Sequence, residues 1–207
     1  MYTPEHFRLE DRDEITTLLQ DYSFATLVSG DSEASLTATH IPFVYDPAPG
    51  PHGRLTAHMA RANPHWQDFA NDKDVLVIFA GPHSYISPSW YVNEPAVPTW
   101  NYAAVHAWGK PQIIEEDTAK RALLYRLIET HEAGFENPWR YDGSEEFMAK
   151  MVRATVAFEI DISRLEAKAK LGQNRSAEDQ AGTAAGLRRQ GDDLSRALAD
   201  LSEGSDS

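Results

Sequence analysis

The chain has no cysteine among its 207 residues. This absence excludes disulfides, thiolate nucleophiles and cysteine-ligated zinc or iron–sulfur sites, and it is compatible with a reducing cytoplasm. Long hydrophobic runs are also missing, because no segment reaches the roughly 18 uninterrupted apolar residues of a membrane span. The opening residues MYTPEHFRLEDRDEI lack a basic stretch followed by an apolar run, so we expect no secretory signal. We therefore expect a cytoplasmic protein without a membrane partner.

Positive charge is scarce as well. Lysine and arginine number 19 against 32 aspartate and glutamate residues, and the net charge is −13. Binding to nucleic acid draws much of its free energy from the neutralisation of phosphates, so this balance argues against direct DNA contact. One local reversal comprises Arg164, Lys168, Lys170 and Arg175. It could hold a phosphate group, or it could be a strand edge whose lysines discourage pairing.

Familiar catalytic motifs are absent from the sequence. It contains no G-x-S-x-G, Walker A, G-x-G-x-x-G or H-E-x-x-H pattern. The eight histidines have no compact ligand spacing, so we expect no metal site. The sequence leaves the catalytic residues unassigned and does not decide whether the protein is an enzyme.

Hydrophobic periodicity predicts more strands than helices. β-branched and apolar runs predict strands over 23–30, 34–46, 54–59, 74–81, 104–115 and 155–169. Helical spacing and capping residues predict helices from Asp11 to Tyr22, from Asn63 to Asn71, over 115–133 and over 144–152. The first three strands suit an antiparallel meander. We therefore expect a mainly β fold with peripheral helices (α+β), built as a small antiparallel barrel.

The composition changes at Ser176 toward alanine, glycine, serine and acidic residues. We therefore predict a domain over 1–175 and an appendage over 176–207. The leucines of the appendage permit two short helices separated at Gly191, although a mobile tail is the alternative. We expect the final SEGSDS to be disordered.

Residues 79–109 combine three of the five tryptophans with four prolines. Proline fixes φ and removes a backbone donor, so the segment should form short extended pieces joined by rigid turns. Rigid turns that carry flat side chains and polar groups suit the wall of a site for a planar ligand. The alternative is a core corner in which the tryptophans only fill space.

A second segment, TAHMARANPHW (56–66), predicts an anion site. A strand ends near His58, Arg61 follows in a turn, and Asn63 opens a helix. The exposed amides of a helix N-terminus, with an arginine fork and a histidine, can bind an anion. The alternative is that Arg61 pairs with a surface acid and Asn63 only caps the helix.

Four ordered segments carry a resemblance to a known family. HMARANPHW, FAGPHSYISPSWY, VPTWNYAAVHAWG and KLGQNRSAED resemble the signature segments of the PaiB family of FMN-binding negative transcriptional regulators. The similarity runs from MYTPEHF to about residue 191. The resemblance implies an FMN-binding split β-barrel that forms a homodimer with the flavin at the subunit interface.

The resemblance also implies roles for individual residues. The phosphate of FMN would lie at the strand–turn–helix segment, and the isoalloxazine ring would pack on the preceding long strand. Residues of the partner subunit would close the site, and the KLGQNR segment would complete it. The residues predicted to bind FMN are thus Thr39, His40, Ile41, His58, Arg61, Asn63, Trp90, Trp100, Asn101, Lys170, Gln173, Asn174 and Arg175. We expect Trp108, on the following strand, to be a core residue.

The sequence is compatible with several functions. The family name implies a repressor, which could act indirectly through a protein partner or by flavin-dependent sensing. An FMN-dependent oxidoreductase is the main alternative, because the cofactor would supply the hydride chemistry. A haem-binding or haem-degrading barrel, with His58, His83 or His106 as axial ligand, and a cofactor-free interaction module are further alternatives.

Overall fold

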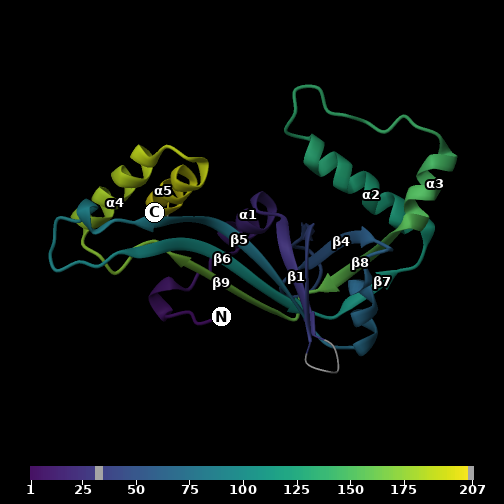
Figure 1. Cartoon of the computed structure of the whole chain (residues 1–207), viewed down its shortest axis with the longest axis horizontal. Helices are drawn as coiled ribbons and strands as arrows, with labels where there is room; N and C mark the ends of the chain where they lie inside the picture. Colours follow the sequence, from purple (N-terminus) through teal and green to yellow (C-terminus); the bar gives the residue numbers. More distant parts are fainter. Residues whose placement is uncertain (31–34, 205–207) are drawn as a thin grey trace. The chain divides into compact units, whose positions relative to one another are not determined.

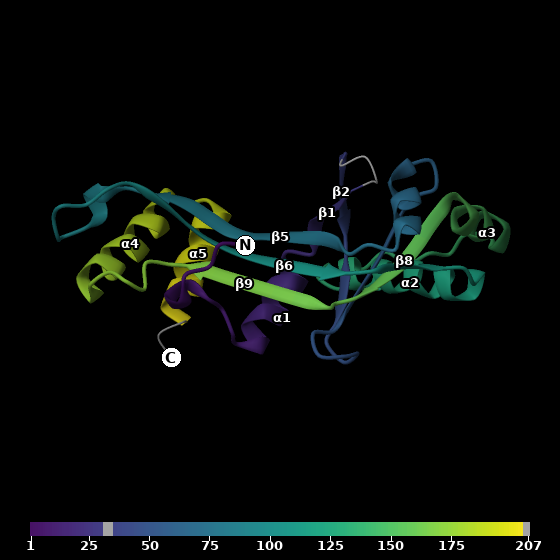
Figure 2. The ribbon, with the colours of Figure 1, turned by 90° about the horizontal axis from the view of Figure 1, so that it is seen from below.

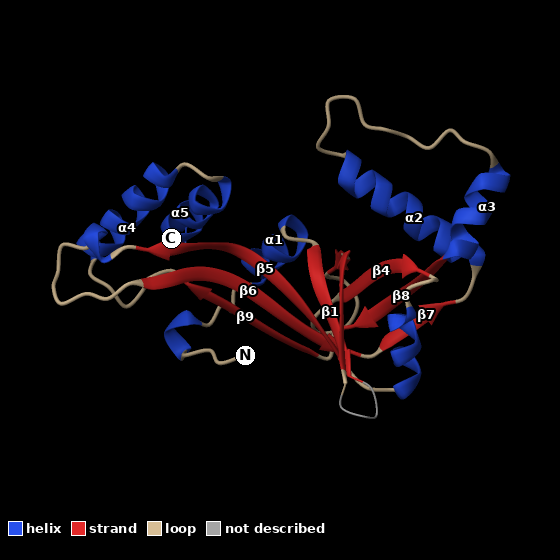
Figure 3. Ribbon diagram, viewed as in Figure 1, coloured by secondary structure: helices blue, strands red, loops and turns tan. Residues whose placement is uncertain are grey.

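A computed structural model describes residues 1–30 and 35–204 of the chain. Over these ranges the chain folds into two antiparallel sheets with helices around them (Figures 1 and 3). The strands are β1 (Phe24–Gly30), β2 (Leu36–Pro42), β3 (Val44–Asp46), β4 (Arg54–Ala60), β5 (Val75–Ile86), β6 (Thr99–Gly109), β7 (Pro111–Ile114), β8 (Thr155–Asp161) and β9 (Arg164–Lys170). The α-helices are α1 (Arg12–Asp21), α2 (Asp117–Glu132), α3 (Glu145–Ala154), α4 (Ala177–Gln190) and α5 (Asp193–Gly204). The 3-10 helices are η1 (Glu5–Phe7), η2 (Pro64–Asn71) and η3 (Pro88–Trp90).

The strand order is β2-β1-β5-β6-β9 in the five-stranded sheet and β3-β4-β8-β7 in the four-stranded sheet. Strands β5, β6 and β9 run side by side in Figure 2. In the four-stranded sheet, β4 pairs with β8 along its whole length, from Arg54 opposite Asp161 to Ala60 opposite Thr155. This mixed α+β architecture confirms the predicted fold class.

The predicted meander is only partly correct, because three predicted strands each supply both sheets. The run 34–46 divides into β2 and β3, the run 104–115 into parts of β6 and β7, and the run 155–169 into β8 and β9. At the first division, the backbone N–H of Phe43 still donates to the Ser23 carbonyl, which continues the register of the β1–β2 pairing, and β3 begins at the next residue. The apolar pattern of a run shows which residues face a core and not which sheet they join, so it could not show where a run changes sheets.

β5 is longer than predicted and continues through Pro82 to Ile86. β1 pairs only with Leu76, Val77 and Ile78 of β5. Pro82 therefore lies beyond this pairing, where its missing N–H breaks no ladder bond to β1. Part of the aromatic–proline segment is thus regular strand.

The described residues form two compact units. Unit 1 contains 1–22, 79–106 and 166–204, and unit 2 contains 23–30, 35–78 and 107–165. β5 and β6 contribute residues to both units. In unit 1, a core cluster joins Ile86, Ala169, Leu171, Leu187, Leu198 and Ala199. In unit 2, Leu123 and Leu127 of α2 pack with Val44 and Ala157 of the four-stranded sheet.

The four helices predicted within residues 1–175 are present at the predicted positions, as α1, η2, α2 and α3. The Asp11 side chain caps α1 by accepting the N–H groups of Asp13 and Glu14, each at 2.9 Å. Gly191, with φ +79°, ends α4 and separates it from α5. The predicted disorder of SEGSDS is wrong for its first three residues, because they complete α5. Residues 205–207, and most of the predicted turn 30–33, lie outside the described ranges.

No helix in the described part of the chain is both long and apolar enough to cross a membrane.

Candidate functional site

Arg61 lies in the turn between β4 and η2, held by the backbone of α3 and β8. Its Nε donates to the Arg153 carbonyl and its Nη2 to the Thr155 carbonyl, both at 3.0 Å. Its backbone N–H donates to the Ala154 carbonyl at 2.8 Å. These bonds orient an exposed guanidinium. A guanidinium carries five N–H donors. Arg61 can therefore donate its remaining N–H groups to an anion while the two bonds to backbone carbonyls hold the guanidinium in place.

Asn63 connects this turn to β2. Its Oδ1 accepts the backbone N–H of His65 at 3.0 Å and so caps η2. Its Nδ2 donates to Thr39 Oγ1 at 3.2 Å. The cap therefore also holds Thr39 of the predicted flavin-facing strand.

A buried imidazole extends the same network. His65 Nδ1 lies 2.7 Å from Thr39 Oγ1, and its Nε2 lies 2.8 Å from Ser29 Oγ. Ser29 donates its hydroxyl hydrogen to Asp68 Oδ2 at 2.5 Å, so it accepts from the imidazole. The network therefore assigns the proton of a neutral His65 to Nε2, with Nδ1 accepting from Thr39. Burial lowers the pKa of His65 and favours this neutral form, although Asp68 acts in the opposite direction.

His58 lies on β4, opposite Ala157 of β8. Its Nδ1 is the one fully buried side-chain nitrogen or oxygen in the described ranges that has no hydrogen-bond partner. Burial lowers the pKa of His58, so the ring is neutral at neutral pH. Buried polar atoms in folded proteins are nearly always hydrogen-bonded, so an orphaned one indicates a missing partner.

A second group of predicted residues lies in unit 1 around Lys170. Lys170 Nζ donates to Thr99 Oγ1 at 2.5 Å and to the Trp100 carbonyl at 2.7 Å. Burial lowers the pKa of Lys170, and the neighbouring charges of Lys168 and Arg175 lower it further. A cation whose pKa is lowered by neighbouring positive charges favours the approach of an anion.

The KLGQNR segment forms a turn after β9. Gln173 accepts the backbone N–H of Leu171 at 2.9 Å and donates to the Ala169 carbonyl at 2.7 Å. Arg175 lies over the Tyr91 ring at 4.5 Å, and Asn174 is exposed. Gln173 therefore stabilises the turn on which the other two residues lie.

The tryptophans of the aromatic–proline segment divide between the two alternatives. Trp90 packs against the α4–α5 core cluster, with its ring beside Gly186. Trp100 is 55% exposed, and its ring lies 6.1 Å from Tyr85 and 6.5 Å from His83. Asn101 is only 3% exposed. Trp90 thus serves as a packing residue, whereas Trp100 offers an aromatic surface.

The expectation for Trp108 needs correction. Trp108 is not a core residue, because it is half-buried and lies 3.6 Å from the Arg164 guanidinium. Side chains alternate along β6, so Trp108 faces away from the side on which Val105 and Ala107 are buried.

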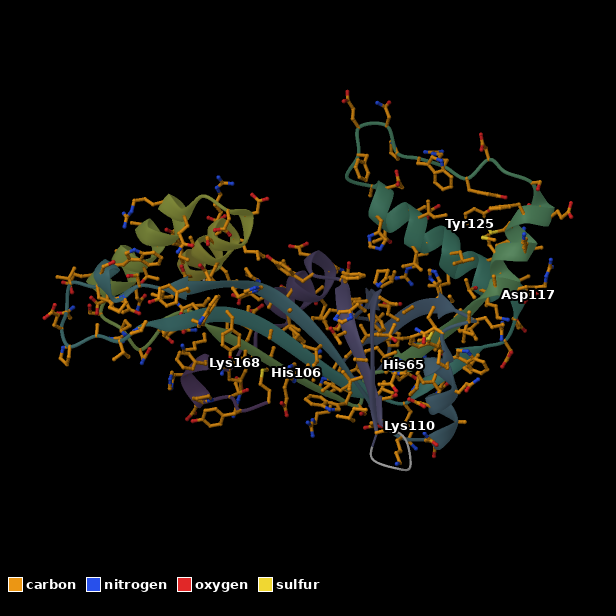
Figure 4. The ribbon with its side chains drawn as sticks, in the orientation of Figure 1. His65, His106, Lys110, Asp117, Tyr125 and Lys168 are labelled. Atoms are coloured by element: carbon orange, nitrogen blue, oxygen red, sulfur yellow. The ribbon has the colours of Figure 1, made fainter. Side chains whose placement is uncertain are left out.

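Lys168, which belongs to the basic segment and is labelled in Figure 4, is buried, and its Nζ lies 5.0 Å from the centre of the Tyr102 ring. β9 is an edge strand, as one of the two interpretations of this basic segment required.

The predicted site residues thus form two groups. Thr39, His40, Ile41, His58, Arg61 and Asn63 lie in unit 2, and Trp90, Trp100, Asn101, Lys170, Gln173, Asn174 and Arg175 lie in unit 1. Within the first group, Thr39 and Asn63 are directly bonded, His40 is exposed and Ile41 is buried. Within the second, Lys170 binds the backbone of Trp100.

Sequence reasoning missed three residues that organise the first group. Ser29, His65 and Asp68 form the buried network behind Thr39. His65 and Asp68 are three residues apart in a predicted helix, which could have indicated that they share a face. Ser29 offered no such signal, because its bond to His65 joins residues 36 apart in sequence.

The sequence of this chain is similar to a known protein family and to individual known proteins. Residues 1–164 match the family described as "Putative FMN-binding domain". "Protease synthase and sporulation protein PAI 2" of Bacillus subtilis (strain 168) is 35% identical over 204 residues, which are 98% of this chain and 97% of that protein. An uncharacterized protein of Saccharomyces cerevisiae is 34% identical over 137 residues, which are 56% of this chain and 81% of that protein.

Two solved structures share the fold. The FAD and heme binding protein from Mycobacterium smegmatis has a TM-score of 0.61 at 20% identity, covering 86% of this chain and 80% of its own. The flavocytochrome Anf3 from Azotobacter vinelandii has a TM-score of 0.62 at 15% identity, covering 84% of this chain and 75% of its own. These likenesses confirm the split-barrel fold, and the family match confirms FMN as the cofactor. The chain belongs to the PaiB family of FMN-binding split-barrel proteins.

Proposed function

We propose that this chain is an FMN-dependent regulator of the PaiB type, and that it holds the flavin phosphate at the β4–η2 turn. The observation that carries the assignment is the pairing of two features in one segment. An exposed guanidinium, that of Arg61, is oriented by two backbone carbonyls, and His58 Nδ1 is buried without a partner. Both features fit a ligand that carries an anionic group and hydrogen-bonding atoms.

Each residue of the first group then has a physical role. Arg61 binds the phosphate through its planar fork of donors. Asn63 fixes the start of η2, and Thr39 and Ile41 present β2 as a surface for the ring. His58 remains uncharged because burial lowers its pKa, so it can bond to the flavin without adding charge. Bound FMN supplies the redox chemistry, and these residues supply its orientation.

We further propose a homodimer in which Trp100 and Lys170 of the second group close the site of the partner subunit, while Trp90 and Gln173 support them through packing and the turn. Trp100 supports this arrangement, because a ring that is 55% exposed is available to stack on a planar ligand. Lys170 supports it as well, because its depressed pKa reflects burial among other cations. An anionic ligand would relieve that repulsion.

The regulatory role is supported by the name of the Bacillus subtilis relative, a protease synthase and sporulation protein. The net charge of −13 argues that regulation does not involve direct DNA contact. We therefore propose cytoplasmic regulation through a protein partner or through flavin-dependent sensing.

Comparison of FMN with riboflavin tests the phosphate assignment. Arg61→Ala should weaken FMN binding roughly 10- to 100-fold, as expected for the loss of a charge-assisted hydrogen bond. Riboflavin lacks the phosphate, so its affinity should barely change. Arg126→Ala, which removes an exposed arginine from α2, is the matched control. Equal losses for FMN and riboflavin would mean that Arg61 only supports the fold.

Two further measurements test the remaining assignments. Light scattering should give the mass of a dimer, and a monomer that binds FMN with full affinity would contradict the shared site. Anaerobic addition of NADH or NADPH should leave the flavin oxidised. Bleaching of the flavin absorbance would instead support the alternative function, an FMN-dependent oxidoreductase.

A further inference from the structure

A cavity of about 480 Å³ lies in unit 2 between α2 and the loop that leads to α3. This loop runs alongside α2, and Tyr125 projects from that helix (Figures 1 and 4). The lining that matters here comprises Tyr125, Glu129, Glu132, Trp139, Arg140 and Tyr141. The volume falls in the range of small-molecule pockets, roughly 300–1,000 Å³. None of these residues belongs to the flavin site proposed above.

Three aromatic rings form the wall of this cavity. The Tyr141 ring lies 6.4 Å from Tyr125 and 6.3 Å from Trp139, and each pair is inclined at 63°. Rings inclined in this way enclose a concave space, whereas parallel stacking would fill it. Their negative faces can therefore surround a positive group within the roughly 6 Å at which cation–π attraction acts.

Hydrogen bonds hold the wall in place. The Tyr141 hydroxyl donates to the Ser144 carbonyl at 2.7 Å, and the backbone N–H of Trp139 donates to Glu132 Oε2 at 2.7 Å. The Tyr141 ring also stacks on Phe147, with the ring centroids 6.3 Å apart. A preorganised cage loses less conformational entropy when it binds a ligand than a mobile loop does.

The charge of the lining favours a cation. Glu129 and Glu132 supply two negative charges against the single positive charge of Arg140. Arg121 lies near Tyr141, but its charge is matched by an ion pair with Glu145. Carboxylates can accept hydrogen bonds from an ammonium group while the rings contact its alkyl substituents.

We propose that this aromatic cage binds an organic ammonium ion. A primary alkylammonium would donate hydrogen bonds to the glutamates, and a quaternary ammonium would fill the space between the rings. Both share the chemistry that the cage recognises, a positive charge with an apolar surface. This proposal is independent of the flavin assignment, because it uses different residues.

Calorimetry on the full-length protein loaded with FMN tests the proposal at constant ionic strength. The probes are choline, n-butylammonium and 3,3-dimethylbutan-1-ol, the uncharged carbon analogue of choline. We expect saturable binding of at least one cation and weaker binding of the uncharged analogue. A preference for choline would identify a quaternary site, and a preference for n-butylammonium a site that uses the glutamates as acceptors.

Two lining variants with matched controls locate the binding. Trp139→Ala and Glu129→Gln should each weaken cation binding roughly 3- to 30-fold, as the loss of a cation–π or carboxylate contact implies. Phe135→Ala and Glu136→Gln change exposed residues of the same loop outside the lining, so they should bind as the unchanged protein does. Unchanged FMN uptake would show that each variant is folded.

Three results would overturn the proposal. They are the absence of saturable binding for both cations, equal affinity for the uncharged analogue, and full affinity in both lining variants. A fall in oligomer mass in Trp139→Ala without any cation binding would identify the cage as an interface instead.

Discussion

His65 is a buried histidine of unit 2, and His58 is a half-buried histidine of the same unit whose Nδ1 is fully buried. His65 has hydroxyl partners on both ring nitrogens, whereas Nδ1 of His58 has no partner. Burial lowers the pKa of both rings below the ordinary histidine value. Protonation of His65 at Nδ1 would also require Thr39 to reorient its hydroxyl. The two rings therefore couple the stability of unit 2 to pH.

We predict that the free energy of unfolding falls as the pH drops below about 6.5, the ordinary histidine pKa. Below this value the unfolded chain binds protons that the folded histidines exclude, so stability is complete above it and is lost toward acid. The slope should be at most about 1.4 kcal/mol per pH unit for each histidine. Urea denaturation between about pH 7.5 and about pH 5.5 measures it, around that same reference pKa.

His58→Leu should reduce this slope, because it removes one of the two titrating groups. His131→Gln changes an exposed histidine of α2 and should leave the slope as it is. A His58→Leu variant that loses stability with acid as steeply as the unchanged protein would contradict this explanation.

The packing of α4 against η3 shows how an element depends on glycine. A Cβ on Gly186 would lie 2.5 Å from Cε3 of the Trp90 ring, and a Cβ on Gly182 would meet the Trp90 carbonyl oxygen. Both glycines lie inside α4, where alanine is favoured by roughly 1 kcal/mol on helix propensity alone. Close approach to Trp90 therefore outweighs propensity at these positions.

We predict that Gly186→Ala destabilises the protein by roughly 1–3 kcal/mol, as overpacking of a filled core does. Urea denaturation gives the magnitude, and limited proteolysis shows whether cleavage shifts to α4 and α5. Gly204→Ala is the control, because a Cβ there meets no atom within 4 Å. If Gly186→Ala were as stable as the unchanged protein, helix propensity and not contact with Trp90 would govern this position.

At the scale of the whole molecule, the net charge of −13 governs encounters with other macromolecules. It repels polyanions over distances of about a Debye length, which is greatest at low salt. We therefore predict no binding to duplex DNA in a fluorescence anisotropy titration, even at low salt. DNA binding that weakens steeply as salt is added would instead demonstrate phosphate contacts and direct repression.

The division of the chain at residue 175 remains a proposal. Gln173 and the positive φ of Gly172 (+93°) mark a turn after β9, as a boundary there requires. Leu187 and Leu198 of the appendage are nevertheless fully buried against residues of β5 and β9. The appendage is thus a packed part of unit 1.

Much of the local structure was predictable because its causes are local. Asp11 and Asn63 cap the helices that they were predicted to begin, and Gly191 separates the last two helices. Capping and backbone preferences act within a few residues, so a single sequence reveals them. The predicted anion segment 56–66 indeed places Arg61 in a turn beside a capped 3-10 helix.

The sequence by itself determined the caps Asp11 and Asn63, the approximate positions of the longer helices, the net charge and the signature segments of the family. Only the tertiary structure decided that single predicted strands divide between two sheets, and that Ser29, Thr39 and His65 form one buried network. It also assembled the cage from Tyr125 of α2 and two rings of the following loop. The physical reason is that periodicity records which side of an element is apolar. The partner on that side is chosen by chain packing between residues that are distant in sequence.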